Sequence, residues 1–353
     1  GNSRLPKLFI PSAGFAPAET RHGRTLVTRL SIVIPCLGPC EQFEETLASV
    51  LQHRPDRSEI IVAHRQPYSD PYQLRDEVTF SHVAANSLVD LVNDAVQDAR
   101  GDVVHLLAAG TEVQEGWTHF ALRHFADPRI AAVAPLVLKL ASPGRIETMG
   151  VSYRRGGQRV SVGHDLPIPD HHALQDEVLG PSLLAGFFSR DAILALGGFC
   201  REVGDELADI DFALALRDLG CRFVLEPKSQ VSCVPQGKSR SLMGAVSRGW
   251  SAETLFWRHW VQEGRAASLL AHPLTTLVDA AQHEGMIAGG LKLFGRTLGL
   301  SSIRAQQGYE QQLTAAAELL GDLETRSDSL ALPTIRDERI QPAASRSARQ
   351  RAA

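Results

Sequence analysis

Short apolar runs alternate with amphipathic stretches over the first half of the chain. A β-branched run that ends at Pro35 is typical of a buried parallel strand. The next stretch places Phe43, Leu47 and Val50 at helical spacing, and Gly101 is expected to cap a later helix. The predicted order is strand 30–35, helix 41–52, strand 59–63, helix 86–99 and strand 102–107. This alternation predicts a doubly wound α/β sheet.

The same alternation continues to about residue 225 and then stops. The further predicted elements are helix 115–125, strand 130–137, an irregular stretch over 140–180, helices 190–196 and 210–219, and strand 222–225. After about residue 238, three or so amphipathic helices are predicted to run to about 325. The predicted organisation is therefore an N-terminal arm over 1–29, an α/β domain over 30–235, a helical extension over 236–325 and a tail over 326–353.

Composition narrows the function classes. The chain has 353 residues, 44% of them apolar and 22% charged, as in globular proteins. A net charge of −4 argues against a nucleic-acid partner, because binding to phosphates needs a basic face. Arginines are the only charged residues from Arg339 onward, so a disordered basic tail is expected there.

Hydropathy and cysteine content indicate where in the cell the protein is expected. No run of eighteen apolar residues occurs, and the apolar stretch 286–300 is interrupted by Lys292 and Arg296. A cytoplasmic protein is expected, at most peripheral to the inner face of a membrane. Five cysteines, an odd number, indicate a reducing compartment. Cys36 and Cys40 are four residues apart without a second pair, which argues against a zinc site.

Seven short motifs, in order, resemble family 2 glycosyltransferases. They are Ser31–Pro35, Glu44–Val50, Asn93 with Ala99–Asp102, Thr111–Trp117, Gly186 with Arg190, Gly197–Phe199, and Asp209–Asp211. The resemblance covers about residues 30–260. It implies an α/β fold of the GT-A (Rossmann-like) type, with a mixed, mainly parallel sheet flanked by helices and a C-terminal helical extension.

The resemblance also implies a set of reactive positions. Family members hold a divalent metal with an Asp-rich motif at the end of the central strand, helped by a later His. An Asp after the second strand reads the nucleotide base, and an acidic helix start supplies the general base. Such chemistry needs hard oxygen ligands on the metal and a positioned proton acceptor.

Most of these positions have changed in this chain. Ala108, Ala109 and Gly110 stand where the metal-binding carboxylates are expected, and Glu112 lies beyond the ligand position. The metal His corresponds to Cys233, and a thiolate is a poor ligand for Mg²⁺. No metal site and no cofactor are therefore expected.

Two positions keep a candidate role. The base-reading Asp is replaced around His64 and Arg65; His64 either contacts a base or is an exposed residue at a strand end. Asp209 and Asp211 open a predicted helix. Asp209 is the better candidate for a general base, although a carboxylate there also offsets the helix dipole.

Basic residues are the alternative to a metal for neutralising a diphosphate. The candidates are Arg65, Arg154, Arg155, Arg190 and Arg248. The predicted nucleotide-sugar contacts are Pro35, His64, Arg65, Ala108, Gly110 and Arg190. The adjacent pair His171 and His172 is a weak metal candidate, because neighbouring side chains rarely face one ion.

Three functions remain open. The favoured one is a degenerate enzyme that acts as a binding or scaffold protein in glycan or polysaccharide assembly, with a donor pocket filled by His64, Arg65 and the segment 140–180. The second is an active, metal-independent inverting glycosyltransferase that uses a nucleotide-sugar donor, a glycan acceptor and Asp209 as base. The third is an unrelated nucleotide-binding module. A protein partner in glycan assembly fits the first.

Overall fold

The computed structural model describes residues 30–154, 158–168, 178–234, 241–259, 272–278, 280, 285–301 and 305–330. The predicted arm over 1–29 lies outside these residues, as does the predicted tail beyond Leu330. The first five residues assigned to that tail belong to the last helix.

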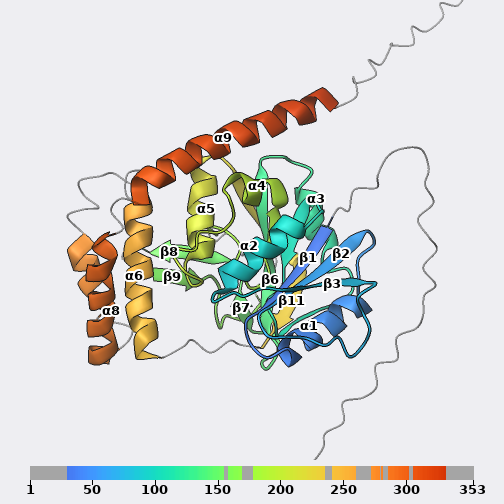
Figure 1. Cartoon of the computed structure of the whole chain (residues 1–353), viewed down its shortest axis with the longest axis horizontal. Coiled ribbons are helices and arrows are strands. Elements are labelled where there is room, and N and C mark those ends of the chain that lie inside the picture. The colour runs from blue at the N-terminus through green and yellow to red at the C-terminus, as the bar shows by residue number, and fades with distance from the viewer. Residues whose placement is uncertain are drawn as a thin grey trace, which may run out of the picture.

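One mixed sheet forms the centre of the molecule (Figure 1). Its strand order is β3-β2-β1-β4-β10-β6-β11-β5, with β7 paired to β6. Strands β3, β2, β1 and β4 are parallel to one another, β6 and β11 are parallel, and β10 is antiparallel to both β4 and β6. The strands of this sheet are β1 (Leu30–Cys36), β2 (Ser58–His64), β3 (Val78–His82), β4 (Val103–Leu106), β5 (Thr111–Val113), β6 (Ile130–Lys139), β7 (Ile146–Thr148), β10 (Phe187–Ser189) and β11 (Arg222–Cys233).

Helices cover both faces of this sheet. The described helices are α1 (Glu41–Gln52), α2 (Leu88–Asp98), α3 (His119–His124), α4 (Arg190–Ala195), α5 (Ala208–Asp218), α6 (Leu242–His259), α8 (Gly285–Gly299) and α9 (Ala305–Leu330). Side chains of α1 and α3 pack in one core, and side chains of α2, α4 and α5 pack in the other. The fold class predicted from the sequence is confirmed.

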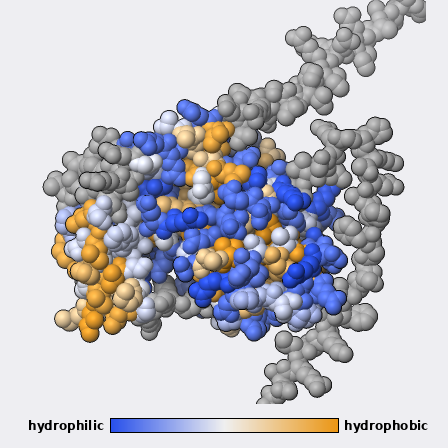
Figure 2. All heavy atoms as spheres, viewed as in Figure 1, coloured by the Kyte–Doolittle hydropathy of each residue, from blue (hydrophilic) through white to orange (hydrophobic). Residues whose placement is uncertain are grey.

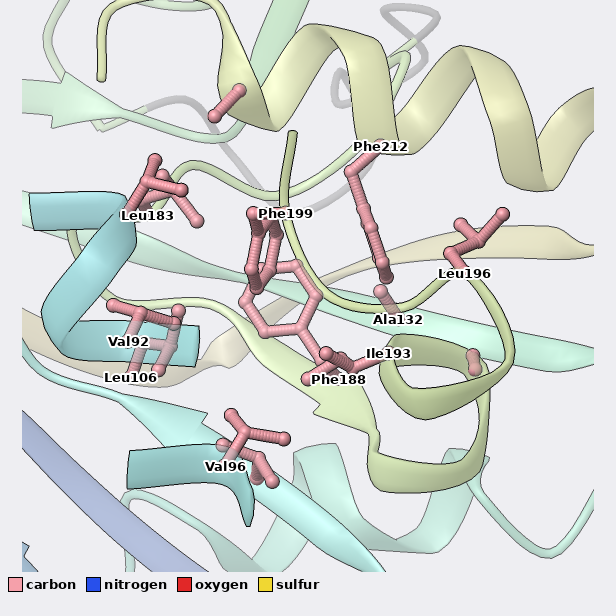
Figure 3. Packing of buried hydrophobic residues seen from close by; sticks show 14 of the residues in the cluster. Val92, Val96, Leu106, Ala132, Leu183, Phe188, Ile193, Leu196, Phe199 and Phe212 are labelled. Carbon is pink, nitrogen blue, oxygen red and sulfur yellow. The ribbon is translucent and has the colours of Figure 1, made fainter. Parts of the chain in front are cut away.

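The core that contains the side chains of α2, α4 and α5 is built around three aromatic rings. Figure 3 shows Phe188, Phe199 and Phe212 pointing toward one another between the sheet and α5. The Phe199 and Phe212 centroids lie 4.5 Å apart, and Phe188 meets Phe199 edge-on at 5.4 Å. Offset and edge-on contacts of this kind are favourable beyond the area they bury. The core therefore fixes α5 and the loop before it against the sheet.

Several short elements were not predicted. Strands β3, β5 and β10 are three to five residues long, and the stretch expected to be irregular contains β7 and the hairpin of β8 (Val151–Arg154) and β9 (Gln158–Ser161).

The expected role of Gly101 as a helix cap is corrected by the structure. Helix α2 ends at Asp98 with Ala99 as its C-cap, whereas a Cβ at Gly101 would lie 2.6 Å from the Ser31 nitrogen. Glycine is needed there for close contact with β1 and not for a helix cap.

Asn93 hydrogen-bonds α2 to the loop that contains Gly197, Gly198 and Phe199. Its Nδ2 donates to the Phe199 oxygen at 2.8 Å, and its Oδ1 accepts from the Phe199 nitrogen at 2.8 Å. A Cβ at Gly198 would come within 2.6 Å of Asn93 Oδ1, so this glycine makes room for the amide. Two motif positions that are 106 residues apart thus form one contact.

We expect Asn93→Ala to lower the free energy of unfolding by about 2 kcal/mol, because two backbone groups of Phe199 lose their partner. Chemical denaturation monitored by circular dichroism measures this change. The control is Gln97→Ala at an exposed position of the same helix, where almost no change is expected. Equal effects of the two substitutions would show that the Asn93 contact does not stabilise the fold.

Candidate functional site

The carboxyl ends of the parallel strands meet at one edge of the sheet. In register, Pro35 and Cys36 of β1 lie beside Ala63 and His64 of β2, and β4 ends at Leu106 just before Ala108. Because β10 is antiparallel to both β4 and β6, the strands β6 and β11 also end at this edge. Ligands of open α/β sheets bind outside this edge.

The turn after β4 occupies the expected metal position. The Ala108 nitrogen donates to the Leu184 oxygen at 2.9 Å, and the Gly110 nitrogen donates to Thr46 Oγ1 at 3.0 Å. Gly110 has a φ of +89°, and a Cβ built there would meet no atom within 4 Å. Hydrogen bonds from its backbone nitrogens therefore hold the turn, and Gly110 faces open space without a carboxylate.

Cys233 lies beside this turn. Strand β5 is antiparallel to β11, and Thr111 is in register with Cys233. The thiol is buried, and burial, reinforced by Glu147 and opposed by Lys139, raises the pKa of Cys233 to about 12. The side chain is a neutral thiol at neutral pH, whereas a metal ligand must be a thiolate.

These residues do not fit a divalent metal. Glu112 is exposed on β5, opposite Ser232, and the turn carries only alanine and glycine. Among the residues described by the structure, no three His, Cys, Asp or Glu side chains are grouped so as to hold a metal ion. Hard cations bind through several oxygen ligands.

His64 is buried, so the interpretation of this residue as an exposed strand end is wrong. Its ring lies 6.1 Å from the Phe43 ring and 6.0 Å from the Tyr68 ring, and its Nδ1 is 2.7 Å from the Gln66 oxygen. Burial lowers the pKa of His64. A neutral imidazole therefore packs inside an aromatic cluster, while the neighbouring Arg65 side chain is exposed.

A pocket of about 520 Å³ lies next to His64, along β2 and β3. Two of its polar side chains, His82 and Arg75, already have partners in the protein. His82 Nε2 is 2.9 Å from the Arg65 oxygen, and Arg75 approaches Asp70 at 3.8 Å. The pocket is lined by His64, Pro67, Tyr68, Arg75, Val78, Thr79, Phe80 and His82.

Asp209, the candidate base, is held by an arginine from the β8–β9 hairpin. Arg159 donates from Nε and Nη2 to Asp209 Oδ2 at 2.9 and 2.8 Å, and from Nε to Oδ1 at 3.1 Å. The carboxylate is only 3% exposed. Two-pronged pairs of this kind are among the stronger charge-assisted contacts. Both oxygens of Asp209 are thus engaged before any substrate arrives.

Asp211, the other predicted catalytic carboxylate, joins α5 to the C-terminal helices instead of facing a ligand. Its Oδ1 accepts from Arg258 Nε at 2.7 Å and from His259 Nε2 at 2.8 Å. Burial alone would raise the pKa of Asp211, but the His259 hydrogen bond and the Arg258 charge hold it below its ordinary value. Arg258 also lies 4.7 Å over the ring of Tyr309 in α9.

Arg190 does not join this site. It follows β10, which runs antiparallel to β4, so Arg190 stands at the amino end of β4, where its nitrogen donates to the Asp102 oxygen at 2.9 Å. Ala108 is at the opposite edge. Among the other candidates, Arg154 ends β8 and Arg248 lies within α6. Arg155, His171 and His172 lie outside the described residues.

Sequence reasoning missed Arg159, Arg258 and His259. Arg159 falls within the stretch expected to be irregular, although Gly156 and Gly157 between two short polar–apolar runs are a hairpin signal. Arg258 and His259 belong to α6, in the region where only amphipathic helices were predicted. Each of the three pairs with an aspartate about 50 residues away in sequence, and such pairing has no local signal.

Comparison with known proteins supports the fold. No protein-family model and no curated protein sequence matches the chain. A mannosyltransferase, PcManGT from Pyrobaculum calidifontis in complex with GDP-Man and Mn²⁺, is 18% identical, with a TM-score of 0.46 over 83% of this chain and 87% of that one. GalNAc-T7, solved with UDP, GalNAc and Mn²⁺, is 13% identical, with a TM-score of 0.53 over 80% of this chain and 57% of its own length. The likeness to GalNAc-T7, with its TM-score of 0.53, shows that the chain has a glycosyltransferase fold of the GT-A type.

The Asp211 cluster gives a prediction about pH. Because the folded-state pKa lies below the ordinary value of 3.8, its stabilising effect is complete above that value and is lost as the pH falls through the folded-state pKa. We expect Asp211→Asn to lower the free energy of unfolding by about 3 kcal/mol at neutral pH. The difference in the free energy of unfolding between Asp211→Asn and the unsubstituted protein should become smaller below about pH 4.

Denaturant titrations at several pH values measure this dependence. Asp98→Asn, at an exposed position at the end of α2, is the matched control and should change stability little at any pH. A constant difference between Asp211→Asn and the unsubstituted protein across the acid range would refute the ion-pair explanation.

Proposed function

We propose that this chain is a glycosyltransferase-fold protein that acts by binding within a glycan- or polysaccharide-assembly system and does not carry out metal-dependent sugar transfer. The observation that carries this proposal is the turn after β4. Ala108 and Gly110 stand where the resemblance places metal-binding carboxylates, and the adjacent Cys233 is a protonated thiol.

The chemistry of sugar transfer supports this proposal. A nucleoside diphosphate leaving group develops negative charge, which a hard cation or a cluster of guanidinium groups must neutralise. The first needs oxygen ligands that the turn does not carry. For the second, Arg190 is at the other edge of the sheet and Arg159 is paired with Asp209.

Asp209, the candidate proton acceptor, is also not free to act as a base. A general base must reach the acceptor hydroxyl with a free oxygen at hydrogen-bond distance. Asp209 offers both of its oxygens to Arg159, and its own Oδ1 also accepts from the Ile210 nitrogen at 2.9 Å. The hairpin would have to release the carboxylate before Asp209 could act as a base.

A metal-independent inverting glycosyltransferase is the second candidate. The pocket along β2 and β3, the open space at Gly110 and the exposed Arg65 favour it, because they leave room and one positive charge at the edge where ligands bind. In this reaction, the acceptor oxygen attacks the anomeric carbon while Asp209 takes the hydroxyl proton. The bond to the nucleoside diphosphate breaks, and the diphosphate leaves with the electron pair.

An assay for diphosphate release separates the two functions. Purified protein is incubated with UDP- and GDP-sugars in the presence of Mn²⁺, Mg²⁺ or EDTA, and released UDP or GDP is measured by a coupled assay. We expect no release above the rate without protein in any condition, because neither a metal site nor a free base is available. Release that persists in EDTA and disappears in Asp209→Asn would establish the metal-independent enzyme.

Restoring carboxylates at the turn tests whether the site was recently disabled. We expect Ala108→Asp with Gly110→Asp to lower the melting temperature by about 2–4 °C, because two neighbouring carboxylates repel each other without a metal. No transferase activity is expected in Mn²⁺, since His64 and Cys233 are unchanged.

The matched control carries Ala108→Asn and Gly110→Asn, which add the same volume without charge. Its melting temperature should lie between those of the unsubstituted protein and the double aspartate variant. Sugar transfer that appears in the double aspartate variant alone would overturn the proposal of a non-catalytic protein.

A further inference from the structure

Helix α8 has a polarity opposite to that of a helix on a water-soluble surface. Its two charged residues, Lys292 and Arg296, are only 7% and 4% exposed. Its outward side chains include Met286, Ile287 and Phe294, which are 96%, 74% and 53% exposed. A helix in water normally turns charge outward and apolar side chains inward. Here the arrangement is reversed.

The exposed apolar residues form a surface that extends beyond α8. The helical stretch 272–278 contributes three more, and Ala280 after it lies against Gly289 of α8. Figure 2 shows this surface as the hydrophobic region over α8 at the lower left. We call it the apolar face; it comprises Leu274, Leu277, Val278, Met286, Ile287, Phe294, Leu298 and Leu300.

Glycines bring α8 unusually close to α6. A Cβ at Gly249 of α6 would lie 2.0 Å from the Lys292 oxygen, and a Cβ at Gly295 would lie 2.0 Å from the Val246 oxygen. Glycine inside a helix costs about 1 kcal/mol relative to alanine, so it needs a packing reason. Close contact through small residues is the way helices associate in lipid, where the hydrophobic effect does not drive them together.

One of the two charges that α8 turns inward, that of Arg296, is paired with a carboxylate of α6. Glu253 of α6 receives Arg296 Nη1 at 3.3 Å and His272 Nε2 at 3.0 Å. Burial alone would raise the pKa of Glu253, yet the His272 hydrogen bond and the Arg296 charge lower it. Charged residues at membrane depth likewise face the interior of the protein and pair with one another.

Hydroxyl groups on these helices are satisfied within their own helix. Thr275 Oγ1 donates to the His272 oxygen at 2.9 Å, Thr297 Oγ1 donates to the Phe294 oxygen at 2.7 Å, and Ser301 Oγ donates to the Leu298 oxygen at 2.9 Å. Protein–protein interfaces carry about one hydrogen bond per 100–200 Å². Hydrocarbon needs no such partner, so the apolar face matches a lipid surface better than a second protein.

The length of α8 decides how it meets a bilayer. Its 15 residues span about 22 Å, which is less than the roughly 30 Å of a hydrocarbon core. No helix in the described part of the chain is long and apolar enough to cross a membrane. Trp250 of α6, against whose oxygen Gly299 packs, is 38% exposed, and tryptophan favours the boundary between lipid and water.

We propose that the apolar face is a membrane-binding surface, with α8 and the stretch 272–278 lying in the interfacial region of one leaflet of a lipid bilayer. Such binding is driven by burial of apolar side chains among the acyl chains. The proposal is independent of the proposed function, because it uses no residue of the edge where the sheet would bind a ligand.

Flotation with phosphatidylcholine vesicles tests this surface, with a parallel arm that includes an anionic lipid. We expect the protein to float with neutral vesicles and to stay bound in high salt, because apolar burial is not screened. Phe294→Glu combined with Leu298→Glu should weaken vesicle binding at least about tenfold, since each introduces a charge into the lipid. Leu319→Glu in α9, at a position that is 52% exposed, is the matched control and should bind unchanged.

Several outcomes would overturn the proposal. The protein could fail to float with any vesicle, or it could float only with anionic vesicles and be released by salt. If the α8 and α9 substitutions weakened vesicle binding equally, the apolar face would not be the surface that binds the membrane. A dimer in solution that Phe294→Glu with Leu298→Glu converts to a monomer, without vesicle binding by the unsubstituted protein, would assign the face to a second copy. Circular dichroism spectra of the variants check that each remains folded.

Discussion

Buried carboxylates, each paired with an arginine, determine how the parts of this molecule are joined. Asp209 pairs with Arg159, Asp211 with Arg258, and Glu253 with Arg296. A carboxylate taken out of water without a partner costs several kcal/mol, so removing either member of such a pair is strongly destabilising. The three pairs connect the β8–β9 hairpin to α5, α5 to α6, and α6 to α8. Hydrogen bonds from His259 and His272 complete two of them.

The sequence predicted the parts of the fold whose signal is local. Apolar runs identified β1, β2 and β6, and apolar spacing identified α1 and α2. Strand β10 was missed because three residues carry no periodicity, and its place between β4 and β6 is decided by tertiary pairing. The candidate site depends even more on distant partners. That His64 is buried follows from rings on α1, β3 and the loop after β2, which no pattern around residue 64 reveals.

The carboxyl edge of the sheet has the geometry of a ligand-binding edge of an α/β protein, although the turn after β4 carries no carboxylate. The strands end where an α/β protein binds ligands, and the turn at Ala108 keeps its backbone contacts. At this edge, His82 contacts the backbone of Arg65, and the candidate base Asp209 is paired with Arg159. Sheet geometry is set by buried apolar side chains and backbone hydrogen bonds, so it does not depend on the polar side chains at this edge.

The contact of Asp211 with α6 indicates that the sheet domain cannot be separated from the C-terminal helices without loss of stability. The change of pattern near residue 235 resembles a junction between modules. Among the described residues, however, the Asp211 carboxylate of α5 accepts from Arg258 and His259 of α6. Gln312 of α9 accepts from the same Arg258 at 2.5 Å. A truncated sheet domain would lose the side chains of α6 and α9 that belong to its core, and it would leave the Asp211 carboxylate without Arg258. Chimeras that transplant the sheet must therefore carry α6 and α9 with it. The unit that folds is larger than the unit suggested by its strands.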